Sequence, residues 1–328
     1  MSLAPFELMP GDEEGQAITE PPHWFTKAIN VVPESRRIDV RGTSIHYLQW
    51  GLREKPGLLL VHGNGAHARW WSFVAPFLAR EYSVAAMDIS GMGDSGWRDE
   101  YALEIFAEEQ MAVCKDAGFF AHHEPPVIVG HSFGGFITIL TGSLYGERLA
   151  GTVIVDSPVN PPDKPRPGPN SRGLAHKIYP DFESALSRFR LAPPQPCENL
   201  YIVDYIARHS LREVDRPEGG KGWSWKFDPS IWRRFNLGDI GARLAATQCR
   251  IAIMRGEHSL LLPPEVGDYM FSLLGRAAPI IEVPQARHHV MLDQPLAFVA
   301  ALRALLADWN HSDPLRRIVG AGEPPNSL

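Results

Sequence analysis

Short, wholly apolar runs recur along the chain and alternate with stretches of helical periodicity. Six runs suit strands buried on both faces of a sheet, namely Gly57–Val61, Ser83–Asp88, Pro126–Gly130, Thr152–Asp156, Arg250–Arg255 and Pro279–Val283. An opening hairpin of Ile38–Val40 and Ile45–Trp50 precedes them. Apolar residues three and four apart predict helices at about Ala68–Arg80, Ala102–Ala117, Ser132–Tyr145, Pro264–Leu274 and Pro295–Asp308. This alternation predicts an α/β protein with a doubly wound, mostly parallel sheet of eight strands.

One long segment interrupts the alternation between the sixth and seventh expected strands. It begins with the proline-dense stretch PVNPPDKPRPGPN, which cannot form regular structure. Helical pieces are expected around Phe182–Phe189 and Leu200–His209. We interpret residues 158–246 as a helical cap, with the core in residues 35–157 and 247–312. Residues 1–34 are then an N-terminal arm, and residues 313–328 are a C-terminal tail.

Composition narrows the class of protein without naming its chemistry. Of the 328 residues 44% are hydrophobic, and the net charge of −6 carries no clustered basic patch, so neither nucleic acid nor membrane is an expected partner. The first residues resemble no signal peptide, and no apolar run reaches the roughly 20 residues that cross a bilayer. Three widely spaced cysteines suit a reducing compartment, so we expect a cytoplasmic protein. The oligomeric state is left open.

The motif Gly130-His131-Ser132-Phe133-Gly134 stands between an expected strand and an expected helix. A sharp strand-to-helix turn with this G-x-S-x-G pattern presents the serine oxygen above the sheet, so Ser132 is the candidate nucleophile. The N–H of Phe133 can then stabilise an oxyanion. The loop after Gly57–Val61 is expected to supply a second donor, for which we choose Asn64. His131 is a further candidate for contact with substrate.

Two adjacent histidines follow the last expected strand, and either could serve as general base. Here the sequence resembles the α/β-hydrolase superfamily, in which a histidine commonly stands five residues before an acidic residue that precedes a Pro-opened helix. Counting back from Asp293 selects His288 rather than His289. The stretch from Asp88 to Ser95 also resembles a structural loop of that family, D-x-x-G-x-G-x-S. The resemblance implies the α/β-hydrolase fold, with the cap inserted between core strands 6 and 7.

The catalytic acid departs from the common family pattern. Ser259 stands where many members carry an aspartate, in the loop Arg255-Gly256-Glu257-His258-Ser259. A branch of small bacterial esterases shows a similar Arg-Gly-x-x-Ser loop, with the acid moved to the end of the preceding core strand. That resemblance favours Asp156 as the acid, with Ser259 as an auxiliary hydrogen-bonding residue. Glu257, two positions before Ser259, remains the alternative acid.

These residues predict a serine hydrolase that cleaves an ester or lactone through an acyl-enzyme. Thioester cleavage, C–C cleavage of a diketone-like substrate and non-enzymatic binding of a small ligand remain alternatives. No organic cofactor is required, and the histidine and cysteine spacings indicate no metal site. Aromatic residues of the expected cap either pack its own core or line an apolar or aromatic substrate pocket. The candidates for substrate contact are Tyr205, Trp223, Trp225 and Trp232.

Overall fold

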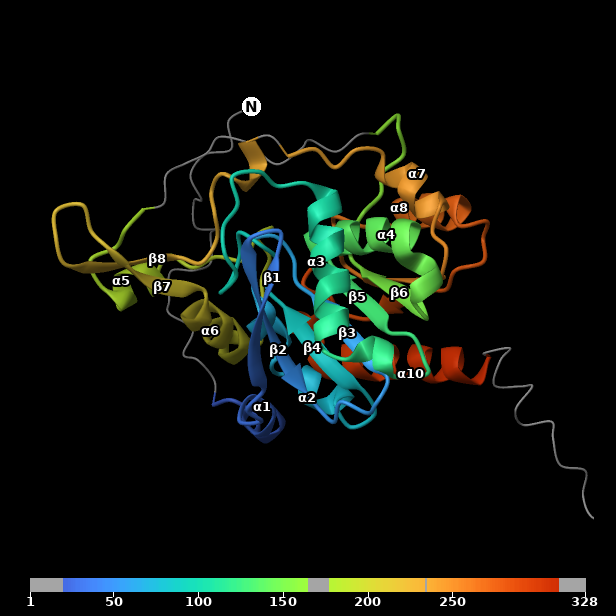
Figure 1. Ribbon diagram of the computed structural model, residues 1–328, viewed down its shortest axis with the longest axis horizontal. Coiled ribbons are helices and arrows are strands. Elements are labelled where there is room, and N and C mark those ends of the chain that lie inside the picture. Colours follow the sequence, from blue (N-terminus) through green and yellow to red (C-terminus); the bar gives the residue numbers. More distant parts are fainter. Residues whose placement is uncertain (1–19, 165–176, 234, 313–328) are drawn as a thin grey trace, which may run out of the picture.

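The computed structural model describes residues 20–164, 177–233 and 235–312, and its centre is one eight-stranded sheet (Figure 1). The strands are ordered β1-β2-β4-β3-β5-β6-β9-β10. They span Glu34–Val40, Thr43–Trp50, Ser83–Met87, Gly57–Val61, Val127–His131, Gly151–Val155, Arg250–Gly256 and Ile280–Val283 in that order. β2 runs antiparallel to β1 and β4, and all neighbours from β4 to β10 are parallel. The predicted fold class is confirmed.

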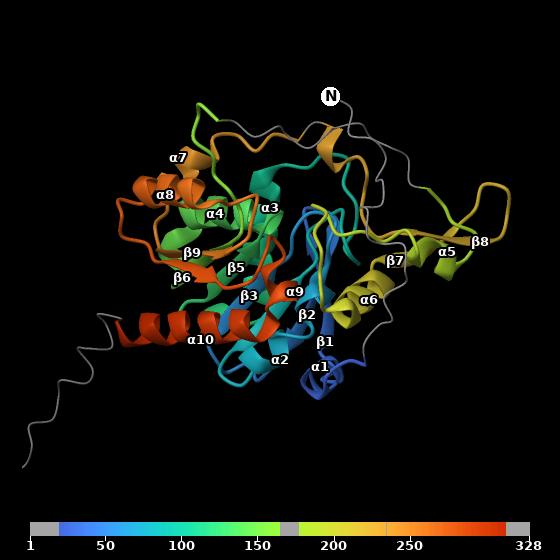
Figure 2. The same cartoon turned by 180° about the vertical axis from the view of Figure 1, so that it is seen from behind.

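Helices cover both faces of the sheet, because every central strand is apolar on both sides. In β3, Leu58 and Leu60 join one buried cluster, whereas Leu59 and Val61 join the other. The first cluster includes side chains of α2 (Ala75–Leu78), α9 (Val290–Asp293) and α10 (Pro295–His311). The second includes side chains of α3 (Leu103–Asp116), α4 (Phe133–Tyr145), α7 (Ile240–Ala245) and α8 (Pro264–Leu273). Figures 1 and 2 show the two helical layers from opposite sides.

Two local expectations differ from the structure. The opening hairpin is longer than predicted, since its turn contains only Arg41 and Gly42, both in the left-handed region that suits a tight hairpin. The helix expected over residues 68–80 is instead a 3-10 turn, Ala68–Trp71, followed by the short α2. Pro76 has no N–H to donate and stands at the start of α2, where a helix tolerates proline.

The segment between β6 and β9 is not purely helical. It contains α5 (Phe182–Leu186) and α6 (Leu200–His209), and then an antiparallel pair, β7 (Leu211–Asp215) and β8 (Lys221–Trp225). This hairpin extends away from the main sheet in both views (Figures 1 and 2). A 3-10 turn at Ile231–Arg233 and α7 complete the segment. The hairpin was missed because a single pair of short strands with two tryptophans gives little periodicity.

The N-terminal part that the structure describes is anchored on the body. α1 (His23–Ile29) buries Phe25, whose ring lies 4.9 Å from that of Tyr201 on α6 and 6.0 Å from that of Phe73. The predictions for the first 19 residues and for the tail fall outside the described residues. In the described part of the chain, no helix combines the length and the apolar character that a membrane span requires.

Candidate active site

Ser132 lies between β5 and α4, on a turn that strains the backbone. Its φ is 52° and its ψ is −117°, a conformation that costs a non-glycine residue on the order of 1–3 kcal/mol. The Ser132 N–H donates to the Val155 carbonyl at 2.9 Å, which fixes the turn against β6. Gly134 permits close packing, because a Cβ there would lie 2.4 Å from the His62 carbonyl oxygen. The tight turn therefore holds Ser132 outside both β5 and α4.

The imidazole of His288 connects Ser132 to a buried carboxylate. His288 Nε2 lies 3.0 Å from Ser132 Oγ, and His288 Nδ1 lies 2.9 Å from Asp156 Oδ1. Since an ionised carboxylate only accepts hydrogen bonds, Nδ1 carries the ring hydrogen and donates a hydrogen bond to Asp156. Nε2 is then free to accept the proton of the Ser132 hydroxyl. The structure thus brings together three residues that are far apart in the sequence, with the tautomer that a serine relay needs.

Asp156 directly follows β6 and is fully buried, in the left-handed conformation with φ 48°. Its Oδ1 also accepts from Ser259 Oγ at 2.6 Å, and its Oδ2 accepts from the Gly256 N–H at 2.9 Å. Arg255 holds this loop by donating from Nε to the Leu262 carbonyl at 2.9 Å. In the Arg-Gly-x-x-Ser pattern, Arg255 therefore fixes the loop, whereas Gly256 supplies a backbone donor and Ser259 a hydroxyl donor to the Asp156 carboxylate.

Glu257, the alternative acid, lies elsewhere. Its side chain is 38% exposed and accepts from the Gln285 N–H at 2.8 Å. Within the described residues it has no hydrogen bond to His288, whose Nδ1 is already occupied by Asp156. The geometry therefore favours Asp156 over Glu257.

The start of α4 and the loop after β3 both lie beside the nucleophile. Phe133 is the first residue of α4, so its N–H has no carbonyl acceptor one turn earlier. The loop after β3 also packs against the turn at Ser132 between β5 and α4, here called the elbow, because a Cβ on Gly63 would lie 3.1 Å from Ser132 Cβ. Asn64 follows Gly63 and is exposed. This arrangement is compatible with the oxyanion donors expected at Phe133 and Asn64, and that role stays a prediction.

Two further histidines surround the proposed base. His131 is buried, and its Nε2 donates to the His288 carbonyl at 3.0 Å. His289 is also buried, and its ring centroid lies 4.9 Å from that of His288. Burial, reinforced by the neighbouring His288, lowers the pKa of both rings well below the usual histidine value. His131 thus supports the His288 backbone, whereas the role in substrate contact predicted for it stays untested.

Of the aromatic residues proposed for substrate contact, Trp232 is the one beside the elbow. Its ring centroid lies 5.0 Å from that of Phe133, and Phe235 packs 5.5 Å from the same ring. Trp232 is only partly buried. The inserted segment therefore places an aromatic surface next to the residue that follows the nucleophile.

The other three aromatic candidates make contacts away from this elbow. Trp223 lies against Phe182 with ring centroids 4.9 Å apart, and Trp225 lies 6.1 Å from Tyr179. Both tryptophans stand on β8, in the projecting hairpin. Tyr205, on α6, packs edge-to-face against the buried aromatic residue of α1. These contacts favour packing of the inserted segment over the predicted lining of a substrate cleft.

Sequence reasoning missed Gln195, which joins the inserted segment to the loop that carries the candidate base. The Gln195 side chain accepts from the His289 N–H at 3.1 Å and donates to Asp293 Oδ2 at 2.9 Å. Asn199 Nδ2 donates to the Leu292 carbonyl at 2.7 Å. No local signal marks Gln195, since only the fold brings it to a residue 98 positions away.

Asp88, expected to be structural, organises the loops beneath the site. It accepts from His46 Nδ1 at 2.6 Å and from the Ala68 N–H at 2.6 Å. Burial disfavours its ionisation, but the hydrogen bond from His46 prevails and lowers the pKa of Asp88 to about 2. Ser95 Oγ donates to the Asp88 carbonyl at 2.7 Å. These contacts agree with the scaffold role that the family resemblance implies.

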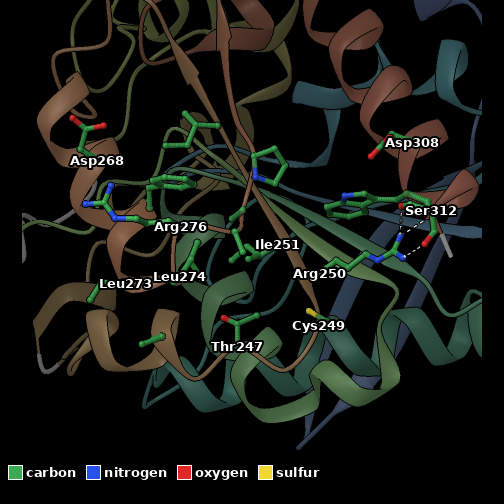
Figure 3. Close-up of a pocket in the computed structure, with 18 residues that line it drawn as sticks. Thr247, Cys249, Arg250, Ile251, Asp268, Leu273, Leu274, Arg276, Asp308 and Ser312 are labelled. Carbon is green, nitrogen blue, oxygen red and sulfur yellow. Dashed lines mark hydrogen bonds between the residues drawn. The ribbon is translucent and has the colours of Figure 1, made fainter. Parts of the chain in front are cut away.

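A groove of 1240 Å³ lies where β9 and β10 begin, at the end of the strands opposite to Ser132 (Figure 3). Arg250 and Ile251, which line it, begin β9, and Ile280 begins β10. Ser132 and Asp156 follow the carboxyl ends of β5 and β6, which run parallel to β9. The groove is therefore separate from the Ser132 site.

Curated proteins that resemble the chain include hydrolases of different kinds. Human epoxide hydrolase 4 is 28% identical over 125 residues, covering 37% of this chain and 33% of the relative. The pimeloyl-[acyl-carrier protein] methyl ester esterase of Chromobacterium violaceum is 26% identical over 256 residues, covering 76% and 94%. The chain spans about a third of the length of the first curated relatives it matches.

Solved structures show the same fold at low sequence identity. E-2-(Acetamidomethylene)succinate hydrolase superposes with a TM-score of 0.69 at 17% identity, covering 84% of this chain and 99% of the other. The thioesterase domain of the curacin biosynthetic pathway gives 0.66 at 21% identity, covering 82% and 99%. Residues 58–302 match the model of the alpha/beta hydrolase family, and the chain therefore belongs to that family.

Proposed function

We propose that this member of the family is a serine hydrolase acting on a carboxylic ester or lactone. The observation that carries the proposal is the continuous relay from Ser132 Oγ through His288 to Asp156, with distances of 3.0 and 2.9 Å. A relay with these roles activates a serine for attack on an acyl carbon.

In the proposed cycle, His288 Nε2 accepts the Ser132 proton as Oγ bonds to the substrate carbonyl carbon. The N–H groups of Phe133 and Asn64 stabilise the negative oxygen of the tetrahedral intermediate. The intermediate collapses, and His288 donates the proton to the departing alcohol. A water molecule, deprotonated by His288, then attacks the acyl-enzyme and releases the acid. Asp156 keeps Nδ1 protonated and stabilises the imidazolium at both stages.

The nucleophile type separates this proposal from other chemistries in the family. Relatives that hydrolyse epoxides or remove halide use an aspartate at the elbow and form an alkyl-enzyme ester, but this chain carries Ser132. The methyl ester esterase that matches 76% of the chain supports ester cleavage. Trp232 and Phe235, packed around Phe133, favour an apolar or aromatic group near the acyl carbon.

Hydrolysis rates on a graded substrate panel test the proposal. The panel contains short and long p-nitrophenyl esters, aryl esters, lactones, a thioester and a diketone, each with wild-type protein and with Ser132→Ala. We expect ester or lactone turnover that falls by at least about 10³-fold in the variant. Equal rates in the two proteins, both shown to be folded, would refute the serine mechanism. Turnover confined to the thioester or the diketone would reject the ester and lactone assignment.

A further inference from the structure

Three histidine rings meet around the Ser132 elbow. One nitrogen from each of His131, His288 and His289 lies within 4.8 Å of the others, and all three residues are buried. The ring centroids of His131 and His288 are 4.8 Å apart, and those of His131 and His289 are 5.6 Å apart. Three imidazoles on one metal place their bonded nitrogens about 3.3 Å apart, so a shift of about 1–2 Å is sufficient.

The remaining ring nitrogens already have the partners that metal-binding histidines usually have. His288 Nδ1 donates to the Asp156 carboxylate, and His131 Nε2 donates to the His288 carbonyl. Such donation fixes the tautomer and leaves the opposite nitrogen with a free lone pair. The opposite nitrogens are His288 Nε2, which accepts from the Ser132 hydroxyl, and His131 Nδ1, which has no partner within the described residues.

A buried nitrogen atom without a partner is a second, independent sign. Within the described residues, His131 Nδ1 is buried and has no hydrogen-bond partner, whereas the buried ring of His289 faces the Pro193 carbonyl. A native interior rarely leaves such groups unsatisfied. Gly63 lies against this nitrogen, and any side chain at position 63 would crowd it, because a Cβ there would lie 3.1 Å from His131 Nδ1. Ser132, which lies next to His288, is half-buried, whereas the three histidines are buried.

We propose that His131, His288 and His289 together bind one divalent transition-metal ion that prefers imidazole, such as Zn²⁺ or Cu²⁺. The ion takes the lone pair of His288 Nε2, which the serine relay needs. Binding therefore inhibits the enzyme, and a chelator reverses the inhibition. The ion is an inhibitor here, so the site adds a regulatory property to the proposed hydrolase. The inhibition rests on the proposed function, whereas the binding does not.

A second group with suitable ligand types, His46, Asp88 and Asp94, makes an instructive contrast. Asp94 is paired with Lys226 Nζ at 2.7 Å, and Asp88 accepts from the Ala68 N–H and from His46. These ligand atoms are held by ion pairs and backbone donors, whereas His131 Nδ1 has no partner within the described residues and His288 Nε2 is shared only with the rotatable hydroxyl of Ser132. The elbow cluster is therefore the site we assign.

Direct metal binding tests the site. Chelator-treated protein is titrated with Zn²⁺ against a chromophoric indicator, as wild type, His289→Phe and His258→Gln. Phenylalanine keeps an aromatic ring against Trp70 and removes both nitrogens, and His258 is an exposed control. We expect one tight equivalent in wild type, at least tenfold weaker binding in His289→Phe and an affinity within twofold in His258→Gln. An unchanged affinity in a folded His289→Phe would overturn the site, as would the absence of stoichiometric binding to wild type.

Spectroscopy of Cu²⁺ bound to wild-type protein covers the case in which His289→Phe does not fold. Three nitrogen ligands in the electron paramagnetic resonance spectrum are expected. A spectrum dominated by oxygen or sulfur ligands would contradict the assignment.

The two proposals fail separately. Saturating Zn²⁺ should slow phosphonate labelling of Ser132 at least tenfold, and EDTA should restore it. Metal binding by a protein that hydrolyses no member of the panel would leave the site standing and remove the hydrolase proposal. Hydrolysis and labelling that are both insensitive to bound Zn²⁺ would remove the inhibition while leaving the hydrolase proposal intact.

Discussion

Ser259 Oγ lies 2.6 Å from Asp156 Oδ1, the oxygen that also accepts from His288 Nδ1. The Ser259 hydroxyl in turn accepts from the Leu261 and Leu262 N–H groups, each at 3.2 Å. Its proton is therefore directed at the carboxylate. A serine thus occupies the loop position where the family resemblance implies an acid, and it donates a hydrogen bond to Asp156, the candidate acid at the end of β6.

Substitutions at Asp156, Ser259 and Glu257 should lower kcat by clearly different amounts. Asp156→Asn should lower kcat by about 10⁴-fold, because the imidazole loses the acceptor that sets its tautomer. Ser259→Ala should cost about 10-fold, the effect of one hydrogen bond to a charged group. Glu257→Gln should stay within twofold. Steady-state rates on the best panel substrate give the ranking, and a larger loss in Glu257→Gln than in Asp156→Asn would reverse our assignment.

A second Ser–His–Asp chain in the structure should be unreactive. Ser35 Oγ lies 3.0 Å from His46 Nε2, and His46 Nδ1 lies 2.6 Å from Asp88 Oδ2. Ser35 stands within β1, however, on no sharp turn and before no helix whose first N–H groups could hold an oxyanion. We expect a fluorophosphonate to label Ser132 at least 100-fold faster, as measured by peptide mass spectrometry. Comparable labelling of Ser35 would show that the elbow contributes little.

Mild acid should destabilise the protein through His67. Burial lowers the pKa of this histidine to about 3, and its Nε2 donates to the Ile206 carbonyl at 3.1 Å in the neutral form. Its unfolded pKa is near 6.5, so stability is complete above that value and is lost as the pH falls toward 3. Between pH 6.5 and 5 the free energy of unfolding should fall by about 1–2 kcal/mol from this residue.

Urea unfolding at several pH values measures the effect of His67. His67→Gln retains an N–H donor without a titrating ring, so its stability should depend less steeply on pH than that of wild type. His258→Gln, at an exposed position, is the matched control. Parallel slopes for wild type and His67→Gln would contradict the prediction.

Substitution by alanine should affect the free energy of unfolding differently at two glycines of α4. A Cβ on Gly134 would lie 2.4 Å from the His62 carbonyl oxygen, so backbone must shift, which costs roughly 1–3 kcal/mol. On Gly142 the nearest atom would be the Thr247 methyl group at 3.2 Å. Gly142→Ala should therefore stay within about 1 kcal/mol of wild type, helped by the helix propensity of alanine. Urea midpoints compare the two, and equal stability would disprove close packing at the elbow.

The sheet was predictable because burial on both faces leaves uninterrupted apolar runs. Gly57–Val61 was located to the residue, and β4, β5, β6, β9 and β10 differ from the predicted strands by one residue at either end. The broken helix before β4 was not predicted, since Pro76 could either begin or interrupt a helix. Local pattern thus defines elements that are buried throughout, and it fails where a few residues decide between alternatives.

Candidate site residues differ in the same way. Ser132 and His288 occupy motifs with fixed neighbours, so their meeting at 3.0 Å follows from chain order in this fold. Trp223 and Trp225 lie in an insertion with no such frame, and sequence alone could not separate a substrate wall from a packed hairpin. Gln195 was invisible because its partners are set entirely by tertiary structure.

The amide of Gln195 connects the inserted segment to the loop that carries His288 and His289 by hydrogen bonds. Exchanging residues 158–246 for another insertion would remove Gln195 and Asn199 from beneath His289 and Leu292. Chimeras built to alter substrate preference should therefore slow turnover as well, unless the graft carries equivalent amides. Substrate preference and turnover rate are therefore coupled through Gln195 and Asn199. A variant intended to change only one of them has to preserve or replace these two amide contacts.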